Sequence, residues 1–142
     1  MGMRIDRDLP GANAAETEQI YAELQSFWSA GLLPHFRAEC ECLLARLVRH
    51  VVPEDELITR TQSDHLRIES LMIDMQDTLD WATRRQSMFE LSATLKEHIR
   101  WEEAVLFEAT QRTLASSEKS ALEADLAARI SEIPPPPPWP GG

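Results

Sequence analysis

The sequence predicts an all-α protein, folded as an antiparallel helical bundle. Apolar residues recur at steps of three and four through most of residues 14–132, as expected for helices with one buried face. Strand-like alternation is absent from the sequence, and the chain has only five glycines, most of them outside the periodic segments. A chain of 142 residues is long enough for one domain with its own core.

Residues 1–13 are predicted to be an irregular arm, because Pro10, Gly11 and Asn13 interrupt any periodicity there. Asn13 is a suitable N-cap for a helix over 14–51. Gly31 and Pro34 should kink this helix without dividing it. Its expected core stripe is Leu24, Trp28, Leu32, His35, Glu39, Leu43 and Leu47.

A second helix is expected to start with Pro53 in its first turn, followed by three acidic residues that favour a helix N-terminus. It should end near Trp81. Its stripe is Leu57, Thr61, His65, Ile68, Met72, Met75 and Leu79.

Two further helices are expected, over 84–114 and 117–131, which completes a bundle domain at 14–132. Residues 133–142 form a proline-rich tail, predicted to be extended. The stripe of the 84–114 helix is Met88, Leu91, Leu95, His98, Glu102, Val105 and Ala109, and that of the last helix is Leu122, Leu126 and Ile130.

Polar residues interrupt the apolar stripes at matching heights. With short links and a rise of about 1.5 Å per residue, the pair His35/Glu39 and the residue His65 both lie about 18–22 Å from the turn near 52–53. His65 and the pair His98/Glu102 are likewise at similar distances from the turn near 82–84. Three helices should therefore bring these side chains to one level of the core.

Within each pair the spacing is H-x-x-x-E, which places both side chains on one helix face, one turn apart. Five buried polar groups would cost several kcal/mol each if unpaired, roughly 2–7 kcal/mol for an amide or hydroxyl and more for a charge. Bound cations would remove this cost, and imidazole with carboxylate suits iron, manganese or zinc. The candidate metal ligands are His35, Glu39, His65, His98 and Glu102.

The remaining features exclude several alternatives. A net charge of −10 argues against binding to nucleic acid or to an anionic membrane. The absence of both a secretory signal and a run of about 20 apolar residues predicts a cytoplasmic protein. Cys40 and Cys42 are too close in sequence to pair on one helix. His50 lies about 22 Å from His35 along the helix, too far to join the site, and Asp64 is expected on a solvated face.

The segments LLPHFRAECECLL, SDHLRI and LKEHIRWEEAVLF resemble the hemerythrin-like, or HHE cation-binding, family. The resemblance implies a four-helix bundle around a non-haem di-iron centre with an oxo or hydroxo bridge. It implies that His35, His65 and His98 are iron ligands and that Glu39 and Glu102 are bridging carboxylates, while Glu103 is an alternative to Glu102.

The sequence departs from the family pattern at two points. No histidine-bearing helix precedes residue 35, and Glu69 stands where some members have a second histidine on the middle helix. An incomplete or single-metal site is therefore one expected state. The apolar groove left by the missing first helix would be covered by the 117–131 helix or by a second copy of the chain, and a homodimer is expected.

The function expected from the resemblance is binding or sensing of O2, or of a related small ligand such as NO or peroxide. Two alternatives stay open. One is a di-iron oxidase or peroxidase-type stress enzyme, so the sequence does not settle whether the protein is an enzyme. The other is a degenerate bundle that acts as a metal-free dimeric interaction protein.

Overall fold

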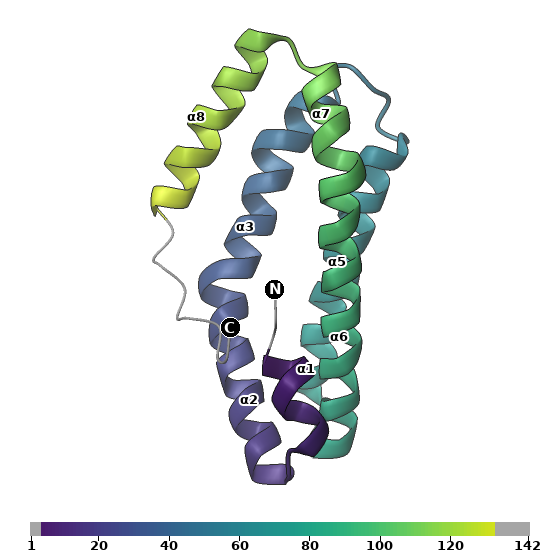
Figure 1. Ribbon diagram of the computed structural model, residues 1–142, viewed down its shortest axis with the longest axis vertical. Helices are drawn as coiled ribbons and strands as arrows, with labels where there is room; N and C mark the ends of the chain where they lie inside the picture. The colour runs from purple at the N-terminus through teal and green to yellow at the C-terminus, as the bar shows by residue number, and fades with distance from the viewer. Residues whose placement is uncertain (1–3, 133–142) are drawn as a thin grey trace.

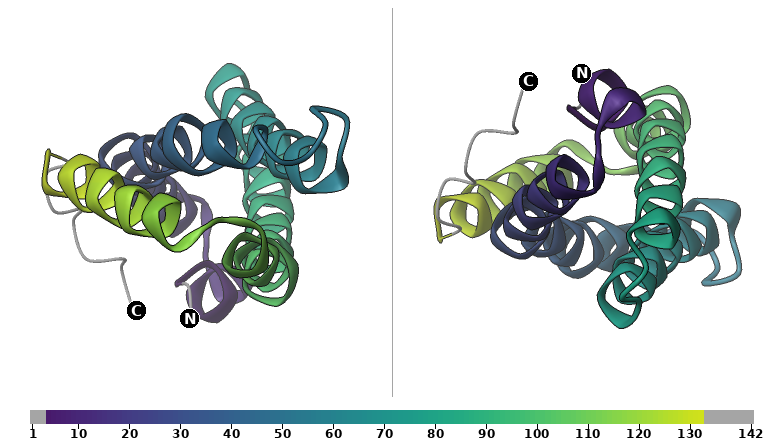
Figure 2. Two further views of the ribbon diagram at one scale, coloured as in Figure 1. Left: turned by 90° about the horizontal axis from the view of Figure 1, so that it is seen from above. Right: turned by 90° about the horizontal axis from the view of Figure 1, so that it is seen from below.

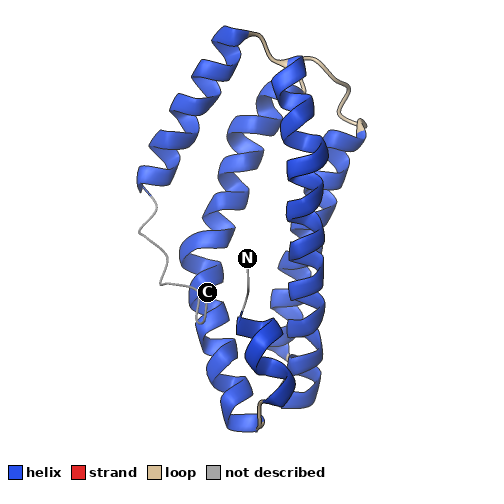
Figure 3. Ribbon diagram, in the orientation of Figure 1, coloured by secondary structure: helices blue, strands red, loops and turns tan. Residues whose placement is uncertain are grey.

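The computed structural model describes residues 4–132, and every regular element within them is a helix (Figures 1 and 3). The all-α bundle predicted from the sequence is therefore confirmed. Three long helices run antiparallel to their neighbours along the bundle (Figure 1). The prediction of an extended tail at 133–142 concerns residues outside the described range.

The first long helix runs without a break from Ala14 to Leu47, as predicted, although it ends a few residues earlier than expected. Asn13 caps it, since its side chain accepts from the backbone N–H of Glu16 at 2.8 Å. The helix comprises α2 (Ala14–Phe27), η2 (Trp28–Leu32), α3 (Leu33–Ala38), η3 (Glu39–Leu44) and α4 (Ala45–Leu47). The segments η2 and η3 are π-helical. Pro34 is the second residue of α3, just after η2, and has no N–H to donate to the preceding turn.

The second long helix, α5, spans Glu56–Asp77. It does not begin at Pro53, because the Asp55 side chain accepts from the N–H of Leu57 at 2.8 Å and caps the helix there. It also ends before Leu79, which lies in the following linker and is 99% exposed, so its predicted place in the core stripe is wrong.

The third long helix consists of α6 (Trp81–Trp101), η4 (Glu102–Leu106) and α7 (Phe107–Thr113). It starts three residues earlier than predicted, because Asp80 caps it through the backbone N–H of Thr83. The π-helical segment η4 adds about one residue to its turn, which shifts the apolar stripe by one position. Leu106 is consequently fully buried, whereas Val105, the predicted core residue, is 42% exposed.

The N-terminal segment is not an irregular arm. Residues Arg4–Asp8 form α1 and Leu9–Gly11 form η1, and they pack against α2 and α6 at one end of the bundle (Figure 1). Ile5 and Leu9 are fully buried in the same apolar cluster as residues of the long helices. The sequence pattern could not reveal this helix, because two buried residues are too few to define a repeat of three and four residues.

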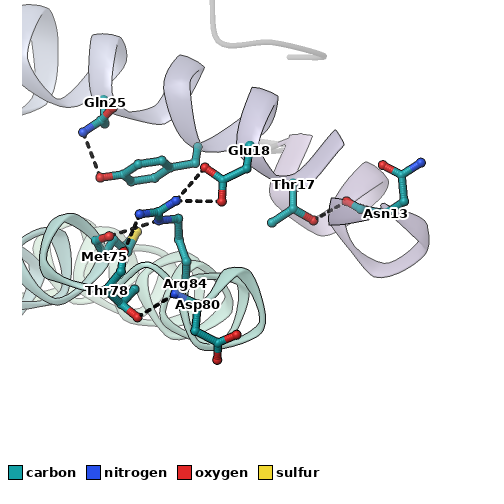
Figure 4. Close-up of polar contacts among 9 residues, drawn as sticks. Asn13, Thr17, Glu18, Gln25, Met75, Thr78, Asp80 and Arg84 are labelled. Carbon is teal, nitrogen blue, oxygen red and sulfur yellow. Dashed lines mark hydrogen bonds and ion pairs between the residues drawn. The ribbon is translucent and has the colours of Figure 1, made fainter. Parts of the chain in front are cut away.

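A buried arginine joins the turn between α5 and α6 to α2 (Figure 4). Arg84 donates to the carbonyls of Met75 and Thr78 at 3.0 and 2.6 Å and to both carboxylate oxygens of Glu18 at 2.6 and 2.5 Å. Its guanidinium also lies 4.4 Å from the centroid of the Tyr21 ring. These contacts hold the two antiparallel ends together.

The C-terminal helix α8 (Ser116–Glu132) folds back along α3 and η3, outside the first long helix (Figure 2). Leu122 is buried against that helix, and Arg129 donates to Glu41 at 2.8 Å. His50, expected to be remote from the site, is paired with Glu118 at the start of α8, with 2.9 Å from its Nε2 to either carboxylate oxygen.

The core is divided into two apolar clusters. One includes Phe36, Ile68 and Leu95, and the other includes Leu43, Ile58 and Leu106. Along their helices, Glu39, His65 and His98 lie between members of the two clusters, whereas His35 directly precedes Phe36 of the first cluster and Glu102 directly follows Trp101 of the second.

Candidate metal centre

Four of the five predicted site residues meet in the core between the two apolar clusters. Glu39, His65, His98 and Glu102 are buried, with exposed fractions of 4%, 6%, 1% and 6%. One ligand atom from each of Glu39, His65 and His98 lies within 4.8 Å of the others. The predicted common level is therefore present, while metal ligation itself remains a prediction.

Both carboxylates of the centre lie at the first residue of a π-helical segment, Glu39 in η3 and Glu102 in η4. Widened turns of this kind occur often at functional sites, because they change the direction of side chains without ending the helix. Glu102 Oε1 lies 3.1 Å from Nε2 of His98, one turn earlier on the same helix. Glu39 Oε1 lies 3.9 Å from Nε2 of His65 on α5.

His35 differs from the other four residues. It is exposed, with 53% of its side chain accessible, so the prediction that it lies on the core face is wrong. The π-helical segment η2 shifts the stripe by one residue, and Phe36 takes the buried position. His35 still approaches the centre from its edge, with its Nε2 3.3 Å from Glu39 Oε1.

Five side-chain atoms of the centre are buried and have no hydrogen-bond partner among the described residues. They are Oε1 and Oε2 of Glu39, Oε2 of Glu102, and Nε2 of His65 and His98. An unsatisfied buried polar group costs about 1–3 kcal/mol. A cation would remove this cost by accepting lone pairs from carboxylate and imidazole together, so the residues fit a bound metal.

The two buried histidines are held from outside by different partners. Nδ1 of His98 lies 2.8 Å from Oδ2 of Asp64, and Nδ1 of His65 lies 3.6 Å from Sγ of Cys40. In both rings Nε2 is therefore the atom left for the centre. Sequence reasoning missed both partners: Asp64 was expected on a solvated face and is only 23% exposed. Its position, three residues after Thr61 and four before Ile68, was the available signal.

Aromatic packing also restricts the imidazoles. The Phe36 ring stacks on His65 at 3.9 Å between centroids, and the rings of His65 and His98 are 5.0 Å apart. Trp101 lies 6.2 Å from His98 on the same helix. These contacts leave the histidine rings little freedom to turn away from the centre.

Electrostatics in the centre shift the pKa values of its four groups in different directions. Burial raises the pKa of Glu39 from 4.5 to about 7, and the nearby Glu102 adds to the rise. Burial likewise opposes ionisation of Glu102, but His98 and Glu39 outweigh it and lower its pKa. Burial lowers the pKa of His65 to about 4. For His98, burial is outweighed by Glu102 and Asp64, and its pKa is raised.

The other candidates lie outside the buried centre. Glu69 and Glu103, the possible alternative ligands, are both exposed. A surface pocket of about 470 Å³ between α3 and α5 reaches the outer side of His65 and Cys40. Within the described residues, no helix is long and apolar enough to cross a membrane.

Comparison with known proteins gives one family. The sequence model of the Hemerythrin HHE cation binding domain matches residues 4–110, which include α1, all three long helices through Thr110 and every predicted site residue. No curated protein and no solved structure shows a significant match. The family match extends over most of the chain and agrees with the helical bundle and its buried histidine–carboxylate cluster, so this protein belongs to the hemerythrin HHE cation-binding domain family.

Proposed function

We propose that this protein binds non-haem iron at Glu39, His65, His98 and Glu102 and uses it to bind or sense O2 or a related small ligand such as NO or peroxide. The family match supports metal binding in general. The observation that carries the proposal is the set of five buried nitrogen and oxygen atoms that make no hydrogen bond among the described residues, contributed by three long helices. Such atoms are costly unless a cation occupies the space between them.

The donor set favours iron. The group formed by Glu39, His65 and His98 contains two imidazoles and one carboxylate. This combination, with coordination positions left open, is typical of non-haem Fe(II) sites that react with O2. The family to which the chain belongs is described by cation binding, which is consistent with this choice.

The histidines near Glu39 differ in burial. His65 and His98 contribute two buried imidazoles, whereas His35 contributes one largely exposed imidazole. We infer that a first ion binds tightly at Glu39, His65 and His98. Glu39, Glu102 and His35 would hold a second ion, and it would bind more weakly because His35 is largely exposed.

The protein's own residues control the surroundings of the centre. When bound, the metal supplies a redox-active position for a small ligand. The apolar clusters above and below the centre limit water, which raises the strength of charge interactions inside it. Glu39 holds a proton in the metal-free state, because burial raises its pKa to about 7, and it releases this proton when its oxygens become ligands.

Metal analysis of protein expressed in iron-rich medium tests the proposal. The wild-type protein should retain one to two irons per chain, and His98→Ala should lose most of this iron. His50→Ala is the matched control, because His50 also faces a carboxylate, Glu118, but lies outside the centre. Absence of iron in the wild type, or equal retention by both variants, would contradict iron binding.

The ligand is tested separately. The absorption spectrum of the reduced iron protein should change when O2 or NO is added and return when the gas is removed. An iron protein whose spectrum responds to neither gas nor peroxide would refute the sensing function while leaving metal binding intact. Continuous consumption of O2 with a reductant would favour the oxidase alternative instead.

We further infer that the chain forms a homodimer. Leu66 and Ile73 lie seven residues apart on α5 and are 64% and 54% exposed, so two turns of this helix present apolar side chains to solvent. Light scattering after size-exclusion chromatography should give twice the chain mass for the wild type. Ile73→Lys should give the monomer mass, and a monomeric wild type would refute the dimer.

A further inference from the structure

Asp64 contacts a residue of the centre without belonging to it. Its Oδ2 lies 2.8 Å from Nδ1 of His98, across the contact between α5 and α6. A carboxylate has only acceptor atoms, so the imidazole is the donor in this hydrogen bond. With Nδ1 engaged by Asp64, Nε2 of His98 is the ring atom that faces the centre, where it is buried and lies 3.1 Å from Glu102 Oε1.

Further contacts hold this hydrogen bond in place. Nε of Arg60 lies 3.6 Å from the same Asp64 oxygen, one helical turn earlier on α5. The Arg60 guanidinium is also 5.0 Å above the ring of Trp101, which in turn lies 6.2 Å from His98. Asp64 is thus held on one side by a cation, and only 23% of its side chain is exposed to solvent.

The second buried histidine has a much weaker outer partner. Nδ1 of His65 lies 3.6 Å from the Sγ atom of Cys40, and a thiol is a poor hydrogen-bond acceptor. The two imidazoles that converge on the centre are therefore unequal. One is polarised by a carboxylate, and the other is not.

We propose that Asp64 is a positioning residue that makes His98 the stronger imidazole donor of the centre. This inference rests on the proposed metal-binding function. A carboxylate that accepts from Nδ1–H fixes the tautomer and ring direction and increases the electron density at Nε2. A stronger donor stabilises the more highly charged ion, so Asp64 raises metal affinity and lowers the reduction potential of bound iron.

Three variants separate the effect of Asp64 on the ring direction of His98 from the effect of its negative charge. Asp64→Ala removes the acceptor altogether. Asp64→Asn keeps an acceptor oxygen but removes the negative charge. Glu97→Gln is the control, because Glu97 is an exposed carboxylate that lines the same surface pocket as Asp64 and His98. Circular dichroism of the metal-free variants checks that all three are folded.

Affinity is measured with Co²⁺, which reports its ligands through visible absorption bands, and the potential is measured on the iron form. Asp64→Ala should weaken Co²⁺ binding by roughly 10–100-fold, as removal of such outer partners typically does. Asp64→Asn should keep more of the affinity, yet raise the iron potential relative to the wild type. Glu97→Gln should match the wild type in both measurements.

The outcomes also distinguish this inference from the function on which it rests. If the wild type binds Co²⁺ and iron but Asp64→Ala and Asp64→Asn behave like Glu97→Gln, the positioning role is refuted and metal binding stands. If a folded wild type binds neither ion, both proposals fail. If Asp64→Ala loses affinity only because it is unfolded, the folded Asp64→Asn variant provides the test. An iron reduction potential equal to that of the wild type in this variant refutes the positioning role of Asp64.

Discussion

In the metal-free protein, replacing Glu39 with glutamine should raise the free energy of unfolding at pH 8. Glu39 is 4% exposed, and both of its carboxylate oxygens are without hydrogen-bond partners among the described residues. Burial raises its pKa from 4.5 to about 7. Because the folded-state pKa is above the unfolded one, this group's stabilising effect is complete below about pH 4.5 and is lost as the pH rises through about 7.

The pKa shift sets the size of the effect. At about 1.4 kcal/mol per pH unit, the ionised carboxylate costs the folded state about 3 kcal/mol at pH 8. A glutamine side chain retains some cost of burying an amide, so the expected net gain is about 2 kcal/mol. For a chain of this length, that corresponds to a rise in Tm of about 6 °C.

Thermal unfolding followed by circular dichroism, with a chelator present, measures the difference. The gain should fall to near zero at pH 5.5, where only about 1.4 kcal/mol of the cost of ionisation has accumulated in the wild type and the cost of burying the glutamine amide offsets it. Glu103→Gln, at the exposed neighbouring position on η4, should leave Tm unchanged. A saturating metal at about 100 times Kd should reverse the order by adding about 2.7 kcal/mol to the wild type alone. A metal-free Glu39→Gln variant that melts below the wild type at pH 8 would refute the reasoning.

Four further outcomes are expected. Leu106→Ala should cost about 2–5 kcal/mol in urea unfolding and Val105→Ala about 0.5 kcal/mol, and equal costs would contradict the phase shift at η4. Leu9→Ala should cost about 2–5 kcal/mol, whereas an irregular arm would tolerate it. Arg84→Ala should cost about 2–3 kcal/mol, because it leaves two carbonyls without their donor, and wild-type stability would count against the network in Figure 4. Metal binding at pH 6 should release a proton from Glu39, seen as calorimetric heats that differ between buffers; buffer-independent heats would argue against it.

Much of the centre could be predicted because it depends on local spacing. Residues four apart on a helix share a face, so His98 and Glu102 had to lie together on any helix that formed there. Short links between long helices then brought His65 to their level. The centre is assembled from these two regularities, and Glu39, His65, His98 and Glu102 are buried together as expected.

Two of the errors, the predicted burial of His35 and of Val105, have one common physical cause. A stripe drawn with a constant period of 3.6 residues assumes a constant helix, and π-helical turns break that assumption. The turn η2 moves Phe36 into the core in place of His35, and η4 moves Leu106 into it in place of Val105. Widened turns depend on the balance of packing on both sides of the helix, which neighbouring residues along the chain do not reveal.

The amino-acid sequence by itself determined the three long helices, the cap at Asn13 and the level at which histidines and carboxylates meet, because these features arise from backbone hydrogen bonding and regular spacing. Only the tertiary structure decided which side chains complete the centre. Asp64 reaches His98, and Cys40 reaches His65, because of how whole helices are rotated about their axes. That rotation is set by the packing of two apolar clusters drawn from distant parts of the chain, so no single segment encodes it.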